Sequence, residues 1–320
     1  MASPFKKLAS LTIPLLVGIA LIYYQYTNFT AEQLENIKLY FKNANYNYVA
    51  LSLCIAIAGY WARAYRWKYS LDHLGYATKL HNNFFAVGVA YFLNLTIPRS
   101  GEVTRAVLLK KYENVAFDKG FGTIVAERVV DLLIFLLFVF IAFVLQFNII
   151  SEFIFSNISP SKLILIGIIL FVLGIVFLLI WFRSNWIIIG RIKEKFAGLI
   201  EGMTSILVMK DRWKYLFFSF FIWFSYLMMF YVCIFAIPET SNMSFSVVIM
   251  GFIFGSVAIG FTNGGIGAFP ISIQTVLLLY GINKDAGAAL GWIMWTSQTL
   301  LTIVLGLLSY LLLHFFNKVK

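Results

Sequence analysis

The chain has 320 residues, of which 61% are hydrophobic and only 12% are charged. Soluble domains average about half apolar and about a quarter charged residues, so this composition excludes a soluble protein and predicts an integral membrane protein. The net charge of +11 is typical of membrane proteins, which gather Lys and Arg in their cytoplasmic loops. We therefore expect membrane lipids, and no nucleic acid, as partners.

Membrane-spanning helices need about 20 mostly apolar residues. In chain order, the segments that meet this requirement are 8–26, 46–62, 121–147, 161–182, 213–236 and 286–315. The first of them follows Lys6 and Lys7 and has no small-residue cleavage site, which indicates a span and not a removable signal peptide. The sequence thus predicts about six full spans.

Two further apolar segments, 81–97 and 245–262, each end at a helix breaker and are followed by a shorter stretch. The breakers are Pro98, with Gly101 soon after, and the group Asn263, Gly264, Gly265 and Gly267. Residues 270–281 would rise only about 18 Å, too little for a hydrocarbon core of about 30 Å. We therefore expect two re-entrant helical hairpins of opposite orientation, near 81–112 and 245–281.

The distribution of basic residues predicts the orientation. A full crossing by 81–97 would leave Arg99, Arg105 and the following lysines outside, against the positive-inside rule. With a hairpin there, the only basic residues outside are Lys38, Lys42, Lys162 and Lys284. Both termini are then cytoplasmic, and residues 1–320 form a single transmembrane domain of the all-α class.

Opposed broken helices occur in transporters that are built from inverted repeats. The two halves of this chain show no convincing identity, so an inverted repeat stays open beside a single non-repetitive unit. Residues 187–209 carry apolar side chains at three- and four-residue spacing with basic residues between them. This pattern predicts an amphipathic helix on the inner surface, and 31–43 form a weaker one outside.

Ionisable residues in membrane segments mark functional sites by default. The first hairpin contributes Arg99, Glu102 and Arg105, and the next span begins with Glu127, Arg128 and Asp131. Glu102 and Arg105 are three residues apart, and Glu127 and Asp131 four, so each pair shares a helix face. After the break at Pro98, backbone amides near Gly101 would begin a new helix, whose N-terminus attracts anions.

Two compatible interpretations follow for this charged region. The first is a pocket for a lipid phosphate, because guanidinium groups grip phosphate with two hydrogen bonds. Its ligands would be Arg99, Arg105 and Arg128, while Glu102, Glu127 and Asp131 would hold an amine headgroup or carry a coupling proton. The second interpretation is an ion-pair clamp that fastens the hairpin to the following span.

Other polar positions leave alternatives open. Arg63 and Arg66 stand at the predicted end of a span, where anchors that snorkel to the interface are commoner than headgroup ligands. Asn94, within the first hairpin, is suited to capping a helix or lining a cavity. The glycines of the second hairpin allow positive φ and close approach to a ligand, or simply a sharp turn.

Several chemical classes find no support in the residues. The sequence has no Walker A motif and no GxSxG element, and its three histidines lack the spacing of zinc ligands. We therefore expect neither a metal site nor a cofactor, and no enzymatic activity.

The run NLTIPRSGEVTRAVLL, followed by AERVVDLL, resembles the lysylphosphatidylglycerol synthase transmembrane-region family. YWARAYRWKYSL and NGGIGAFP fit the same pattern. The family includes the flippase half of the bacterial multiple peptide resistance factor and stand-alone relatives. The resemblance implies a bacterial inner-membrane protein with a lipid substrate, here without the soluble aminoacyl-transfer domain. The family often has an acidic residue where this chain has Pro270. If that residue contacts a cationic headgroup in the family, the resemblance implies a different lipid here.

The resulting hypothesis is a phospholipid translocase, similar to a flippase. The alternatives are a membrane enzyme or accessory subunit of polyprenyl-linked or glycolipid synthesis, and a scaffold without transport. Further partners compatible with the first hypothesis are a second copy of the chain and a separately encoded lipid-modifying enzyme.

Overall fold

The computed structural model describes residues 4–97, 99–147 and 208–317, together with the isolated residues Leu165, Ile168, Ile169, Ile175 and Ile206. Every regular element in this part of the chain is helical, which confirms the all-α prediction. The long elements are α1 (Pro4–Thr27), α2 (Ala31–Asn43), α3 (Tyr46–His73), α4 (Leu80–Thr96), α5 (Ser100–Glu113), α6 (Phe117–Leu145), α10 (Arg212–Cys233), α11 (Phe245–Phe261), α12 (Ala268–Leu279) and α13 (Lys284–Phe316). Two short 3-10 helices, Ile234–Ala236 and Pro238–Thr240, follow α10.

Four helices are long and apolar enough to cross a membrane: α3, α6, α10 with the turn after it, and α13. They confirm four of the six predicted spans. Helix α1 covers the predicted span 8–26, and its 24 residues give a length of about 36 Å. The predicted span 161–182 and the amphipathic helix 187–209 lie outside the described residues, apart from the isolated positions named above.

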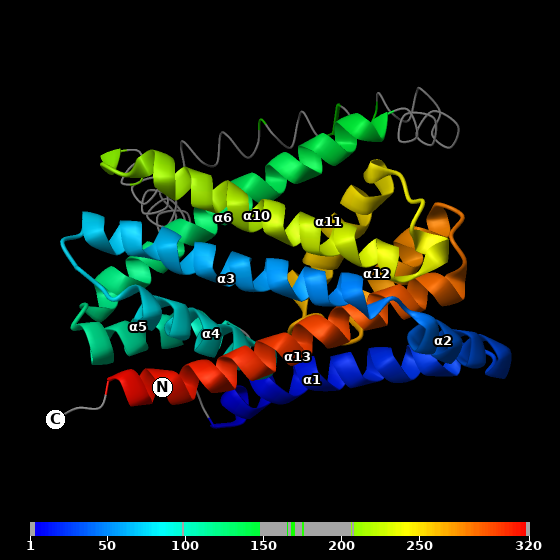
Figure 1. Cartoon of the computed structure of the whole chain (residues 1–320), viewed down its shortest axis with the longest axis horizontal. Helices are drawn as coiled ribbons and strands as arrows, with labels where there is room; N and C mark the ends of the chain where they lie inside the picture. Colours follow the sequence, from blue (N-terminus) through cyan, green and yellow to red (C-terminus); the bar gives the residue numbers. More distant parts are fainter. Residues whose placement is uncertain are drawn as a thin grey trace.

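Both expected hairpins are present, α4 packed on α5 and α11 packed on α12. Helix α4 has 17 residues and α12 has 12, so their lengths of about 26 Å and about 18 Å fall short of a full crossing. Asn82 at the start of α4 bonds reciprocally with Asn317 after α13, at 3.0 and 2.8 Å. Since α12 ends just before α13 begins, the hairpins start at opposite ends of the bundle (Figure 1).

The two hairpin tips meet near the middle of the molecule (Figure 1). Asn263 Nδ2 donates to the carbonyl oxygen of Thr96 at 3.4 Å. In the glycine-rich tip, Gly264, Gly265 and Gly267 have φ values of +59°, +79° and +69°, as expected from their sequence. Pro98 lies outside the described residues. The turn of the first hairpin includes Arg99, which adopts a left-handed conformation with φ of +59°.

One element order occurs twice along the chain. A long helix, a hairpin and a second long helix appear as α3 to α6 and again as α10 to α13. The amide of Asn45, before α3, donates to the carbonyl of Ala236, after α10, at 2.9 Å. Helices α3 and α10 are therefore antiparallel, so the second copy runs opposite to the first. This arrangement favours the inverted repeat.

The arms of the first hairpin approach closely at Gly101. A Cβ atom on Gly101 would lie 2.3 Å from the carbonyl oxygen of Ala90 on α4. The Gly101 amide donates to Asn94 Oδ1 at 2.7 Å, so Asn94 caps the start of α5. The hairpin thus fixes where α5 presents its charged residues.

Gly101→Ala is expected to lower the free energy of unfolding by about 1–3 kcal/mol, because the methyl group pushes α5 away from α4. Gly122→Ala is the matched control, since a Cβ there meets nothing within 4 Å. Thermal unfolding of the purified variants in detergent measures the difference. Equal melting temperatures for the two variants would contradict the close α4–α5 contact.

Candidate functional site

Three helices bring five charged side chains together inside the protein. Helix α3 supplies Arg63 and Arg66, α5 supplies Arg105, and α6 supplies Glu127 and Asp131. Their side chains are between 0% and 7% exposed. We call these five residues the buried cluster. Because charges in a membrane interior are costly, such a group must be internally paired.

The ion pairs of the buried cluster form a continuous chain. Glu127 accepts from Arg105 through both carboxylate oxygens, at 3.0 and 3.3 Å, and from Arg66 at 3.3 Å. Asp131 accepts from Arg66 at 2.6 Å and from Arg63 at 3.2 Å. Each carboxylate therefore holds two arginines, and the order along the chain is Arg105, Glu127, Arg66, Asp131, Arg63.

Helix α10 and neighbouring aromatic residues complete the shell. Two side chains of α10 accept hydrogen bonds from the buried cluster: Ser219 Oγ from Arg66 at 3.3 Å, and the Tyr226 hydroxyl from Arg63 at 3.1 Å. A third, Trp223 Nε1, donates to Asp131 at 3.3 Å. The Tyr226 hydroxyl also bonds Tyr91 of α4 at 3.0 Å. The Arg105 guanidinium lies 3.8 Å from the ring centre of Trp67, a cation–π contact.

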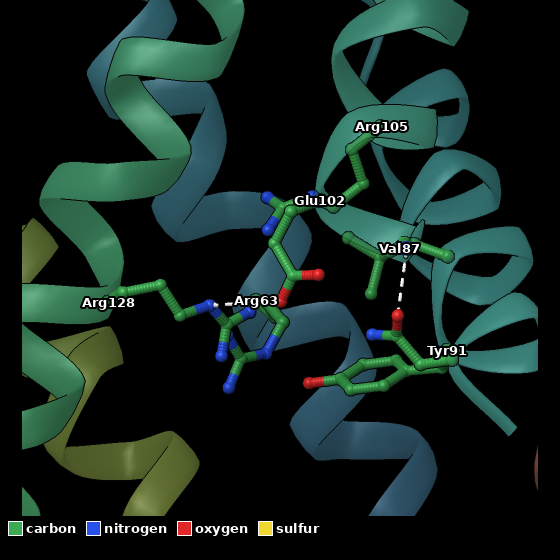
Figure 2. Close-up of a pocket in the computed structure, with 9 residues that line it drawn as sticks. Arg63, Val87, Tyr91, Glu102, Arg105 and Arg128 are labelled. Carbon is green, nitrogen blue, oxygen red and sulfur yellow. Dashed lines mark hydrogen bonds and ion pairs between the residues drawn. The ribbon is translucent and has the colours of Figure 1, made fainter. Parts of the chain in front are cut away.

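A small pocket opens beside the buried cluster, with a cavity volume of about 10 Å³. Its charged lining comes from Arg63, Glu102, Arg105 and Arg128 (Figure 2). Helix α4 supplies the polar Asn94 and a largely apolar wall. A cavity of this size has room for about one water molecule. A headgroup fragment such as a phosphate would therefore fit only after a partly exposed lining side chain, Glu102 or Arg128, moved aside.

Glu102 and Arg128 form the outer layer of this pocket. Arg128 Nε lies 3.6 Å from Glu102 Oε1, and Arg128 Nη1 lies 3.5 Å from Asp131 Oδ2. The Arg128 side chain is 42% exposed and that of Glu102 is 22% exposed. These two pairs are longer and more exposed than the pairs of the buried cluster, so they are held less firmly.

The charges around the pocket favour an anion. Four arginines face three carboxylates, which leaves one positive charge in excess. Within the described part of the chain, four buried atoms of the site have no hydrogen-bond partner: Nε of Arg63, Arg66 and Arg105, and Oε2 of Glu102. Unpaired buried polar atoms are costly, so the described side chains leave this site incompletely satisfied.

The structure brings most of the predicted site residues together. Arg105 and Arg128 line the pocket, and the bond from Arg105 to Glu127 confirms the clamp between the hairpin and the following span. Asn94 both caps α5 and lines the pocket. Arg99 is exposed at the hairpin tip and makes no ion pair with any described residue. Its ligand role stays a prediction.

Two expectations need correction. Arg63 and Arg66 are buried and paired, because α3 continues to His73 and places both within the bundle, so they are not interfacial anchors. The first amides of α5 are also occupied: Ser100 donates to the carbonyl of Ile97 and Gly101 to Asn94. The expected anion site at these two amides is therefore wrong, and the arginines supply the positive charge instead.

Sequence reasoning missed the polar side chains of α10 and Tyr91 of α4. Ser219, Trp223 and Tyr226 are spaced by four and three residues, which places them on one helix face. Buried Tyr and Trp usually find a hydrogen-bond partner, so this spacing was the available signal. The glycine-rich tip, in contrast, contacts the first hairpin but does not line the pocket.

Comparison with known proteins agrees with this architecture. Residues 11–306 match the family described as the lysylphosphatidylglycerol synthase TM region. The chain belongs to this family. A stretch of 99 residues is 36% identical to a UPF0104 membrane protein of Methanocaldococcus jannaschii, and it spans 30% of the length of each protein. No solved structure matches the chain. The family and the four span-length helices establish a multi-pass membrane protein.

Glu127→Gln is expected to lower the free energy of unfolding of this family member by about 3–5 kcal/mol, because Arg66 and Arg105 lose their shared countercharge. Asp72→Asn is the matched control. It removes the partner of Lys68 in a partly exposed pair, which is worth only about 0–1 kcal/mol. Unfolding in detergent by heat or denaturant measures both changes. If Glu127→Gln lowered the free energy of unfolding by no more than Asp72→Asn does, Glu127 would not be the countercharge on which Arg66 and Arg105 depend.

Proposed function

We propose that this lysylphosphatidylglycerol synthase TM region protein is a phospholipid translocase. The observation that carries the proposal is the excess of one arginine over carboxylates around a pocket that adjoins the buried cluster. A lipid phosphate brings the missing negative charge, and its two non-bridging oxygens accept from guanidinium groups in the favoured two-bond geometry. The family's name refers to synthesis of a phospholipid, which supports a lipid as the substrate.

We assign different roles to the charged residues. Arg128 is the main phosphate ligand, since it lines the pocket and forms only long ion pairs. Arg63 and Arg105 also line the pocket and add to its positive potential. Glu127 and Asp131 hold the arginines in place, because each accepts from two of them.

The opposed hairpins support transport between leaflets. Irregular backbone at membrane depth is tolerated only inside protein or beside a wet cavity. Broken helices that meet near the midplane are a feature of alternating-access transporters. In this protein the two tips touch through Asn263 and Thr96, so movement of one hairpin against the other would open the pocket region to either side.

We further propose the inner membrane of a bacterium as the location, with the basic end of the bundle and both termini in the cytoplasm. Lys110, Lys111 and Lys119 lie at that end of α5 and α6, as the positive-inside rule requires. A second copy of the chain and a separately encoded lipid-modifying enzyme are compatible partners.

Arg128→Gln is expected to slow lipid translocation roughly ten- to hundredfold, because it removes charge-assisted bonds to phosphate. The assay reconstitutes the protein in liposomes with fluorescent phospholipids and adds dithionite to bleach the outer leaflet. Lys68→Gln is the matched control, since it also removes one positive charge but belongs to a pair outside the pocket.

Translocation by Arg128→Gln at the wild-type rate would contradict the proposed pocket. Wild-type protein that matches empty liposomes with anionic, zwitterionic and polyprenyl-phosphate lipids would contradict translocation itself. That result would favour the alternative of a membrane enzyme or accessory subunit of polyprenyl-linked or glycolipid synthesis.

A further inference from the structure

Glu102 differs from the other two carboxylates of the site. Glu127 and Asp131 each accept from two buried arginines. Glu102 meets only Arg128, at 3.6 Å, and its second oxygen is buried without a partner in the described part of the chain. Figure 2 shows Glu102 reaching from α5 toward Arg128 on α6, within the pocket.

We propose that, when no lipid is bound, the Glu102 carboxylate takes the place beside Arg128 that the lipid phosphate takes on binding. The phosphate then displaces Glu102 from Arg128. This inference rests on the proposed function and deepens it. In this arrangement Glu102 is a competing internal ligand that sets the affinity for the substrate and allows its release.

Charge conservation makes the exchange feasible. A phosphodiester and a carboxylate each carry one negative charge, so Arg128 keeps one countercharge when the phosphate replaces Glu102. Because Glu102 stays on α5 beside the pocket, the four arginines then face three carboxylates and one phosphate, and the excess positive charge is neutralised. Large changes of charge inside a membrane protein would be costly. The same swap would fail at Glu127, because removing that carboxylate would leave Arg66 and Arg105 unpaired.

Local geometry permits Glu102 to move by its side chain alone. The pair that it forms is long and partly exposed, and such pairs contribute little stability. Glu102 stands in the first turn of α5, where the helix dipole favours a negative charge whether or not Arg128 is nearby. Its backbone can therefore stay fixed against α4 through Gly101, while its carboxylate swings away.

Short-chain phosphatidylglycerol, titrated calorimetrically into the full chain in non-ionic detergent, tests the exchange. Glu102→Gln is expected to bind this lipid about three- to tenfold more tightly than wild type, because the competitor loses its charge. Asp118→Asn is the control, since it removes one exposed negative charge from the first turn of α6. Its affinity should stay within about twofold of wild type, because salt screens distant charges.

Two further titrations identify the ligand and the residue. In an Arg128→Gln background, Glu102→Gln should bring no gain. Inorganic phosphate should not compete with the lipid at equal concentration; equal competition would overturn the lipid as the source of the phosphate.

The outcomes separate this inference from the proposed function. If wild type binds the lipid but Glu102→Gln binds no more tightly than Asp118→Asn, the exchange is wrong and the translocase remains. If Glu102→Gln weakens binding of short-chain phosphatidylethanolamine, Glu102 holds an ammonium group, and the exchange is again overturned. Absence of any lipid binding by the folded wild type would reject both.

Discussion

The sharing of two carboxylates among three buried arginines is the interaction on which the rest of the structure depends. Each charge in the membrane interior is costly unless it is paired, and the pairs here join residues from three different helices. Glu127 can reach Arg66 and Arg105 together only if α3 and α5 both pack against the face of α6 that carries it. The charged cluster thus fixes the relative positions of the long helices and the first hairpin.

The need to pair buried charges also explains why α4 and α5 form a hairpin. Helix α5 carries Arg105 into the bundle and also carries Lys110 and Lys111 in its last turn. A helix that turns back at the midplane meets both demands, because the arginine is buried among carboxylates while the lysines return to the membrane surface. Close packing of Gly101 on α4 then allows the two arms to share the narrow space.

Much of this arrangement could be predicted from local sequence. Span length, the breakers at 98 and 263–267, and the positions of basic residues were sufficient for the hairpins. The charged residues indicated an ion-pair clamp between the first hairpin and the following span as one of two interpretations, but not which residues form it. Arg63 and Arg66 were misjudged because α3 continues through an aromatic and basic stretch that resembles a membrane interface. Their burial depends on which helices cover them, and that information is distributed over α6 and α10. The same holds for Ser219, Trp223 and Tyr226, which are polar partners only once α10 packs on α3.

The site therefore has two layers that differ in how their charges are held. In the inner layer every carboxylate oxygen is engaged and the arginines cannot leave without unpairing a neighbour, so this layer is a fixed positive frame. In the outer layer the pairs are long, and Oε2 of Glu102 has no hydrogen-bond partner among the residues that the structure describes. A binding site for transport needs both properties, because an anion must be attracted to a fixed charge and must also be able to leave. The inner layer meets the first need, and the weak outer pair between Glu102 and Arg128 meets the second.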